Sequence, residues 1–192
     1  MQNTDCNKIS LNKSNIKETD KYIIIKNIGN GSYGSVYLCK EVKTEELYAI
    51  KKINFNIISK KDKESIENEV KLLENVCHPN IVSYKESYLD NDNFFNIVME
   101  YCEGGDAYSE IRKHKSNFSE NLIIDYIIQI CLSLNYIHDL QVLHRDLKTE
   151  NLFFKDRKIK IGDFGIAKSY YDTKNAFTQT VNILSLIITN IN

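Results

Sequence analysis

The sequence predicts an α+β fold, in which a five-stranded antiparallel sheet with one helix is followed by a helical second half. Short segments rich in β-branched residues and separated by turns occupy the first half of the chain. One amphipathic helix interrupts these segments, and a long apolar helix follows them. A length of 192 residues, with 42% hydrophobic and 27% charged residues, is typical of one soluble globular domain.

The strands are expected on either side of clear turn signals. A glycine cluster at residues 29–34 joins the first two strands into a hairpin, and the polar run 90–93 joins the last two. The expected strands are residues 22–28, 35–39, 47–53, 81–84 and 94–100.

The first helix is expected to begin near Ser59, because Asp62 three residues later is suited to the start of a helix. Its apolar residues recur at helical spacing, and Glu69 lies beside the face that meets the sheet. His78-Pro79-Asn80 ends this helix. The apolar stripe consists of Ile66, Val70 and Leu73.

A second and longer helix is predicted at residues 122–138. It is apolar over most of its circumference, so we expect it to be buried on several sides. Two short apolar segments, 152–154 and 158–161, then flank loops that are rich in charged residues.

Charge and cysteine content narrow the class of protein. The 25 Lys and Arg against 26 Asp and Glu give a formal charge of −1, which argues against a nucleic-acid partner. The five widely spaced cysteines include no C-x-x-C pair, which argues against a disulfide framework and a zinc site. Residues 1–20 are polar, and the apolar stretch 181–191 is too short to span a bilayer. We expect a cytoplasmic protein without a membrane partner; nuclear or cytoskeleton-associated location is the alternative.

The glycine cluster has the pattern G-x-G-x-x-G, which also occurs in ordinary tight turns. A dinucleotide site would need these glycines to open a helix, but a strand-like segment follows them, so we discard that interpretation. In a hairpin turn, glycines let backbone N–H groups approach phosphate oxygens, with Val36 as an apolar lid over a purine ring. The residues of this turn are Gly29, Asn30, Gly31, Ser32, Tyr33 and Gly34.

Lys51, on the third expected strand, is a candidate phosphate ligand. Strand alternation puts Ala49 on the same face, where its small side chain leaves room for a base while the ammonium reaches phosphates. Glu69 on the following helix can hold that ammonium in position. A solvated lysine and an ordinary surface pair are the alternatives.

The segment 144–151, of sequence HRDLKTEN, places three chemically distinct polar groups in one loop after a buried helix. Asp146 would orient a substrate hydroxyl and accept its proton, and Lys148 would neutralise charge on a transferring phosphoryl group. Asn151 would hold a magnesium ion. An ordinary polar loop is the alternative.

A second metal ligand is expected at Asp163, in the run Asp163-Phe164-Gly165. The β and γ oxygens of a triphosphate carry several negative charges, which Mg²⁺ would bridge. By itself this run would be only a turn.

Together these motifs resemble the protein kinase family, and more narrowly the NIMA-related serine/threonine kinases. The narrower resemblance rests on residues 48–53, 78–84, 97–106 and 144–149. It covers about residues 22–180 and implies a two-lobed fold, with ATP and Mg²⁺ as cofactors. It also implies protein substrates, with Lys148 pointing to serine or threonine acceptors rather than tyrosine.

The resemblance implies roles for further residues around the nucleotide. Met99 would be the gatekeeper, Glu100 and Cys102 would contact adenine through the hinge backbone, and Phe153 would belong to the ATP-binding residues. Reactivity of Cys102 towards electrophiles is an alternative to inert packing. An internal spine would consist of Leu73, Tyr84, His144 and Phe164.

The resemblance also implies a regulatory contact. Arg145 would pair with a phosphate on the activation segment. Thr180 is the first candidate for the phosphorylated residue, and Thr178 is the second.

These positions divide the chain into a polar tail (1–20), an N-lobe (21–101), a partial C-lobe up to the activation segment (102–180) and a divergent tail (181–192). After Thr180 the family continues into a substrate-docking segment and further helices, which residues 181–192 do not match. We therefore expect a complete N-lobe, with five strands and helix C, and only the first part of the helical C-lobe, leaving apolar faces of 122–138 uncovered. The alternatives to an active kinase are an inactive nucleotide-binding or interaction fragment and a truncated gene model.

Overall fold

The computed structural model describes residues 21–31, 34–114, 118–140, 142–144, 146–163 and 168–169. Both terminal tails lie outside these ranges, and so do some of the residues singled out above. Those residues are Ser32, Tyr33, Arg145, Phe164, Gly165, Thr178 and Thr180.

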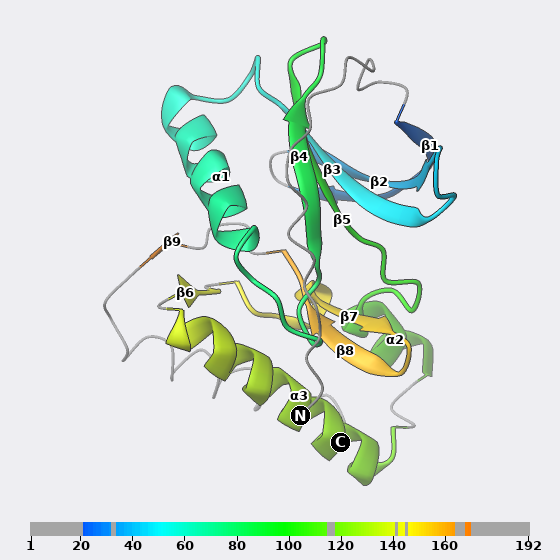
Figure 1. Ribbon diagram of the computed structural model, residues 1–192. Coiled ribbons are helices and arrows are strands. Elements are labelled where there is room, and N and C mark those ends of the chain that lie inside the picture. Colours follow the sequence, from blue (N-terminus) through cyan, green and yellow to red (C-terminus); the bar gives the residue numbers. More distant parts are fainter. Residues whose placement is uncertain are drawn as a thin grey trace.

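The upper lobe is a five-stranded antiparallel sheet with one helix, as predicted (Figure 1). The strand order is β1-β2-β3-β5-β4, so that β1 and β4 form the edges. The strands are β1 (Tyr22–Gly31), β2 (Gly34–Glu41), β3 (Leu47–Asn54), β4 (Tyr84–Leu89) and β5 (Phe94–Glu100).

The helix of this lobe is α1 (Lys60–Leu73), which begins where the sequence predicted. The Ser59 hydroxyl accepts a hydrogen bond from the Asp62 N–H at 3.2 Å and donates to the Asp62 carboxylate at 2.6 Å, which caps the first turn. The apolar stripe of α1 packs on one face of the sheet. The buried residues of that contact are Ile53, Phe55, Ile66, Val70 and Ile97.

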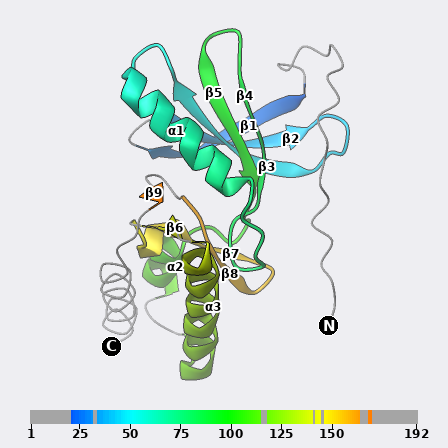
Figure 2. The ribbon, with the colours of Figure 1, turned by 60° about the vertical axis from the view of Figure 1, so that its left-hand side comes forward.

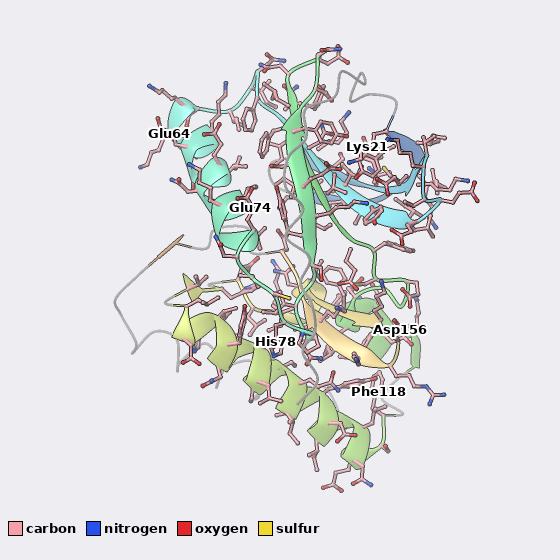
Figure 3. The ribbon with its side chains drawn as sticks, in the orientation of Figure 1. Lys21, Glu64, Glu74, His78, Phe118 and Asp156 are labelled. Atoms are coloured by element: carbon pink, nitrogen blue, oxygen red, sulfur yellow. The ribbon has the colours of Figure 1, made fainter. Side chains whose placement is uncertain are left out.

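The predicted strand at 81–84 is wrong except for Tyr84. Residues 81 and 82 instead pair with the lower lobe, since the Val82 N–H donates to the Ile161 carbonyl at 2.8 Å, whereas the Ser83 carbonyl accepts the Glu100 N–H of β5 at 2.9 Å. The buried Asn80 side chain donates to Gln129 at 2.7 Å and to the Ile159 carbonyl at 2.9 Å. His78 lies in the same connection (Figure 3), and its ring packs at a tilt of 31° against the Tyr136 ring of the lower lobe. The segment therefore joins the two lobes rather than extending the sheet.

The described part of the lower lobe contains two α-helices and two short antiparallel ladders, β6–β9 and β7–β8 (Figure 2). The sequence did not predict α2 (Ala107–His114), whose first turn is capped by the Asp106 carboxylate accepting the Ser109 N–H at 2.7 Å. The remaining elements are α3 (Glu120–Asp139), β6 (Val142–Leu143), the 3₁₀ turn η2 (Thr149–Asn151), β7 (Leu152–Lys155), β8 (Lys158–Ile161) and β9 (Lys168–Ser169).

One face of α3 forms the lower core with the β7–β8 hairpin, through residues such as Leu134, Ile137 and Ile161. The prediction that α3 is buried on several sides is therefore wrong, because only this face is buried. The expectation that apolar residues of this helix are left uncovered is confirmed. Ile124, Ile128 and Leu132 are 46%, 49% and 56% exposed. Among the described helices, none has the length and apolar content needed to cross a membrane.

The described cysteines differ in their state. Cys39, Cys102 and Cys131 are free thiols, of which only Cys131 is exposed. Cys77 is disulfide-bonded, which the cysteine spacing did not predict.

Candidate functional site

The glycine-rich turn is the tip of the β1–β2 hairpin, as predicted. Gly31 lies opposite Gly34 at its end, and Gly29 lies opposite Val36. A Cβ added at Gly34 would lie 1.9 Å from the Lys52 carbonyl oxygen of β3, so only glycine lets the hairpin lie this close to its neighbour. The Asn30 amide oxygen accepts the Ser35 hydroxyl at 3.0 Å and steadies the hairpin from the side.

The sheet brings the predicted nucleotide residues onto one face. Lys51 pairs across β3 and β2 with Val36, and Ala49 pairs across β3 and β5 with Met99. Because directly opposed residues share a face and alternate residues of a strand do too, these four side chains lie on the same side of the sheet. Met99 packs against the α1 cluster, which identifies this as the side covered by α1.

Lys51 reaches the lower lobe. Its Nζ lies 2.7 Å from Asp163 Oδ1, and its side chain is only 13% exposed. Glu69, the partner that the sequence predicted, lies on α1, but its side chain is outside the described part of the structure. Asp163 has a φ of +50°, a left-handed conformation that aspartate adopts more readily than most residues. The described partner of Lys51 is therefore one of the two predicted metal ligands.

Two loops of the site meet at Gly162, a residue that the sequence analysis did not single out. Its carbonyl lies 2.9 Å from His144 Nε2, and its N–H donates to the Asn151 carbonyl at 2.9 Å. His144 is buried, and burial lowers its pKa, so the neutral ring donates through Nε2–H. A Cβ at Gly162 would lie 2.8 Å from the Phe153 ring. In the sequence, the only sign that Gly162 belongs to the site was its position directly before Asp163.

The predicted catalytic loop forms one cluster. The Asn151 side-chain N–H₂ donates to the Asp146 carbonyl at 2.7 Å and to its carboxylate at 3.1 Å. Lys148 Nζ lies 2.9 Å from the same carboxylate, and this hydrogen bond raises the pKa of Lys148. Asn151 is buried, whereas the Asp146 side chain is half exposed. The amide thus orients a carboxylate that faces solvent, where a substrate hydroxyl can reach it.

The expected metal ligands have chemistry that fits magnesium. Within the described ranges, no group of three or more His, Cys, Asp or Glu is placed to hold a metal ion. Mg²⁺ commonly uses one or two protein oxygens and takes its other ligands from phosphates and water. Because the Asn151 amide nitrogen is bonded to Asp146, the amide oxygen is the atom left to face a cation, on a loop that Gly162 joins to Asp163.

Three of the four residues of the predicted internal spine lie in the described part of the structure. Leu73 and His144 are buried, and Tyr84 packs against the cluster that contains Leu73. Leu147, next to Asp146 in sequence, also packs against that cluster, which therefore reaches the loop of Asp146.

The predicted hinge follows β5. The Cys102 thiol is buried, and burial raises its pKa to about 12, which favours inert packing over reactivity. Phe153 on β7 forms an isolated bridge with Asp106, just after the hinge. The side chain of Glu100 accepts Lys155 and Lys160 of the β7–β8 hairpin, a contact that the sequence analysis missed. A lysine between Ile159 and Ile161 in an apolar strand was a signal for a buried acidic partner.

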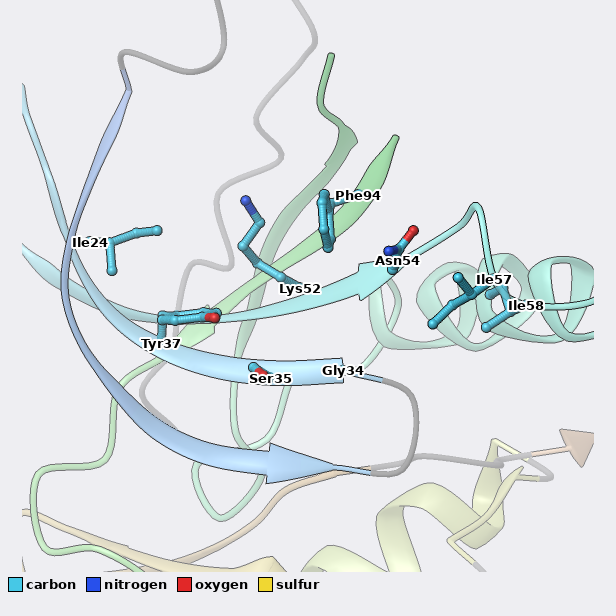
Figure 4. Close-up of a pocket in the computed structure, with 9 residues that line it drawn as sticks. All are labelled: Ile24, Gly34, Ser35, Tyr37, Lys52, Asn54, Ile57, Ile58 and Phe94. Atoms are coloured by element: carbon cyan, nitrogen blue, oxygen red, sulfur yellow. The ribbon is translucent and has the colours of Figure 1, made fainter. Parts of the chain in front are cut away.

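A cavity of about 550 Å³ lies on the opposite face of the sheet (Figure 4). Lys52 and Tyr37 line it, and both alternate with residues of the nucleotide face. Lys52 Nζ pairs with Asp90 at 3.1 Å instead of with the groups around Lys51. This cavity therefore lies on the other side of the sheet from Lys51, although Gly34 at the hairpin tip also lines it.

Comparisons with known proteins show which family this chain is similar to. Residues 22–185 match the family of the protein kinase domain. Serine/threonine-protein kinase Nek1 of Mus musculus is 44% identical over 151 residues, which are 78% of this chain and 12% of that protein. Nek5 of Homo sapiens is 44% identical over 152 residues (78% and 21%), and Nek4 of Mus musculus is 41% identical over 149 residues (77% and 19%). The chain thus spans between 12% and 21% of the length of these curated relatives.

Proposed function

The chain belongs to the protein kinase family, in its NIMA-related serine/threonine branch, and we propose that it transfers the γ-phosphoryl group of ATP to a serine or threonine of a protein substrate. The observation that carries this proposal is the junction at Gly162. It holds the loop of Asn151 and the loop of Asp163 together within reach of Lys51. Phosphoryl transfer needs these groups in one place, because its catalysis is mostly positioning and charge stabilisation.

The nucleotide would lie between the sheet and the β7–β8 hairpin. Its base would rest against Val36 and Ala49, with Met99 at the back and Phe153 on the opposite side. The backbone from Glu100 to Cys102 would supply the hydrogen bonds to adenine. The hairpin tip at Gly31 and Gly34 would cover the phosphates with backbone N–H groups.

ATP binding would replace the Lys51–Asp163 contact. The Lys51 ammonium would turn to the α and β phosphates, where Glu69 could hold it. Asp163 and Asn151 would then hold Mg²⁺, which neutralises charge on the phosphate oxygens during transfer. The 2.7 Å pair supports this proposal because it already brings the Lys51 and Asp163 side chains together at the site.

Asp146 would orient the substrate hydroxyl and accept its proton. Its carboxylate is placed by Asn151, and Lys148 beside it would neutralise charge on the transferring phosphoryl group. Phosphate acceptors are therefore expected to be protein hydroxyl groups that can approach the exposed side of Asp146.

A second candidate is a nucleotide-binding unit that engages a partner without transferring phosphate. The exposed residues Ile124, Ile128 and Leu132 favour it, because a row of apolar side chains on one helix is typical of a contact surface. Both candidates bind ATP, so phosphate transfer distinguishes them.

The test compares the chain with its Asp146→Asn variant. A magnesium-dependent rise in melting temperature with ATP is expected for both proteins, because Asp146 is not needed to bind nucleotide. Transfer of labelled phosphate to casein or to the chain itself is expected only from the unchanged protein, with a loss of about a hundredfold or more in the variant.

Asp92→Asn, in the exposed β4–β5 turn, is the matched control and should transfer normally. An ATP-dependent shift without any transfer would support the nucleotide-binding unit instead. The absence of both the shift and the transfer would refute both candidates.

The cytoplasmic location is a separate proposal, which a fluorescent fusion of the chain would test. Fluorescence in the nucleus or on filaments would contradict it.

A further inference from the structure

The Glu100 carboxylate, at the end of β5, is held by two lysines of the lower lobe. Lys155 on β7 lies 3.1 Å from Oε1, and Lys160 on β8 lies 2.9 Å from Oε2. The Ser83 backbone N–H also donates to Oε2, at 3.2 Å. One carboxylate therefore joins the end of the upper sheet, the segment before β4 and the β7–β8 hairpin.

These three charged side chains are largely withdrawn from solvent. The side chains of Glu100, Lys160 and Lys155 are 18%, 10% and 28% exposed. Burial disfavours a charged Glu100, yet hydrogen bonds from Lys160 and Ser83 lower its pKa. A buried ammonium at Lys160 in turn needs an anion beside it. The contact is therefore a specific charged group and not a loose surface pair.

The carboxylate lies where the chain passes from one lobe to the other. Beyond the hinge, the Gly104 N–H donates to the Phe154 carbonyl at 3.0 Å, and the Phe154 N–H donates to the Gly105 carbonyl at 2.9 Å. The β7–β8 hairpin thus contacts the hinge on both of its flanks. Any rotation of the lobes about the hinge would have to stretch the contacts of Glu100.

We infer that Lys155 and Lys160 are positioning residues, which clamp Glu100 and hold the hinge backbone in the geometry that meets adenine. This inference rests on the proposed nucleotide site. Without the clamp, the lobes would sample more orientations, and nucleotide binding would have to order them. The clamp touches neither the phosphates nor the substrate hydroxyl, so it should affect ATP affinity and not the transfer step.

The kinetic test measures KM for ATP and kcat in Lys160→Met, Lys155→Met, Glu100→Gln and the double variant Glu100→Gln/Lys160→Met. We expect KM for ATP to rise about fivefold or more in each single variant, the lower end of typical coupling between sites, with kcat within about twofold. The double variant should resemble Glu100→Gln, because the two substitutions break the same pair between Lys160 and Glu100. Lys158→Met, at an exposed position of the same hairpin, should behave as the unchanged chain.

A second measurement needs no nucleotide. Hydrogen–deuterium exchange of the whole chain should show faster exchange at the Ser83 and Gly104 amides in Lys160→Met and Lys155→Met than in Lys158→Met. Lys160→Arg keeps the charge and should restore slow exchange at both amides. If Lys160→Met does not fold, the more exposed Lys155→Met decides the question.

The two measurements separate the clamp from the proposed function. If the unchanged chain does not bind ATP, the proposed function fails, and exchange at Ser83 and Gly104 still tests the clamp. The clamp is refuted if these amides exchange equally in Lys155→Met and Lys158→Met. It is also refuted as a positioning device if kcat falls while KM for ATP stays unchanged.

Discussion

The Lys51 ammonium and the Asp163 carboxylate lie 2.7 Å apart and join β3 to the loop that follows β8. These residues are 112 positions apart in the sequence. The pair holds a predicted phosphate ligand of the upper lobe against a predicted metal ligand of the lower lobe. Because the lysine is mostly buried, the pair is screened less than a contact on the surface.

Replacement of Lys51 by methionine should lower the rate of phosphate transfer by about a hundredfold or more, since it removes a charge that stabilises the transferring group. Initial rates with labelled ATP would measure this change. Lys52→Met is the matched control, because Lys52 lies on the opposite face and pairs with Asp90. Equal losses in the two variants would contradict the assignment of Lys51 to the site.

Replacement of Asn80 by alanine should destabilise the chain by about 2 kcal/mol, because it removes the Asn80 donor from the buried Ile159 carbonyl and leaves Gln129 Oε1 with only the Ile159 N–H. The free energy of unfolding in urea would show the loss. Asn91→Ala, at an exposed turn position, should change stability by less than about 0.5 kcal/mol. Similar values for both variants would mean that Asn80 does not join the lobes as proposed.

The stability of the chain should depend on the ionisation of Glu41. This buried carboxylate accepts hydrogen bonds from Lys85 at 2.8 Å and from Thr44 at 2.7 Å. Burial alone would raise the pKa of Glu41, but the contacts with Lys85 and Thr44 outweigh burial and lower it. The unfolded carboxyl, with a pKa of about 4.3, therefore binds its proton at higher pH than the folded one. The resulting stability is present above pH of about 4.3 and is lost as pH falls through the lower folded pKa.

Urea unfolding between pH 7 and pH 3 would test this dependence. Glu41→Gln should be less stable than the unchanged chain at neutral pH, and the difference should shrink in acid. A constant difference across this range would show that ionisation of Glu41 does not contribute.

The thiol of Cys102 should react slowly. With its pKa raised to about 12 by burial, only about one molecule in ten thousand carries the thiolate at pH 8. Iodoacetamide should therefore label the exposed Cys131 well before Cys102, as read by peptide mass spectrometry. Cys131→Ser should remove the fast labelling without changing that of Cys102. Comparable labelling of the two cysteines would restore the idea of a reactive hinge thiol.

Elements with local signals could be predicted from the sequence. The cap at Ser59, the glycine hairpin and the strand Phe94–Glu100 each depend on neighbouring residues, and all three are present. Residues 81 and 82 could not be assigned, because they pair with β8 rather than with β5. The short helix α2 was missed since its cap at Asp106 follows two glycines that indicate only a turn.

By itself, the sequence determined the family of the chain and the identity and order of its chemical groups, because the motifs around Lys51, Asp146 and Asp163 are short and locally spaced. Only the tertiary structure decided which of these groups meet. The Lys51–Asp163 pair, the junction at Gly162 and the clamp on Glu100 join residues of different loops and lobes. No local periodicity encodes such contacts, since they depend on how the sheet and the β7–β8 hairpin pack against each other.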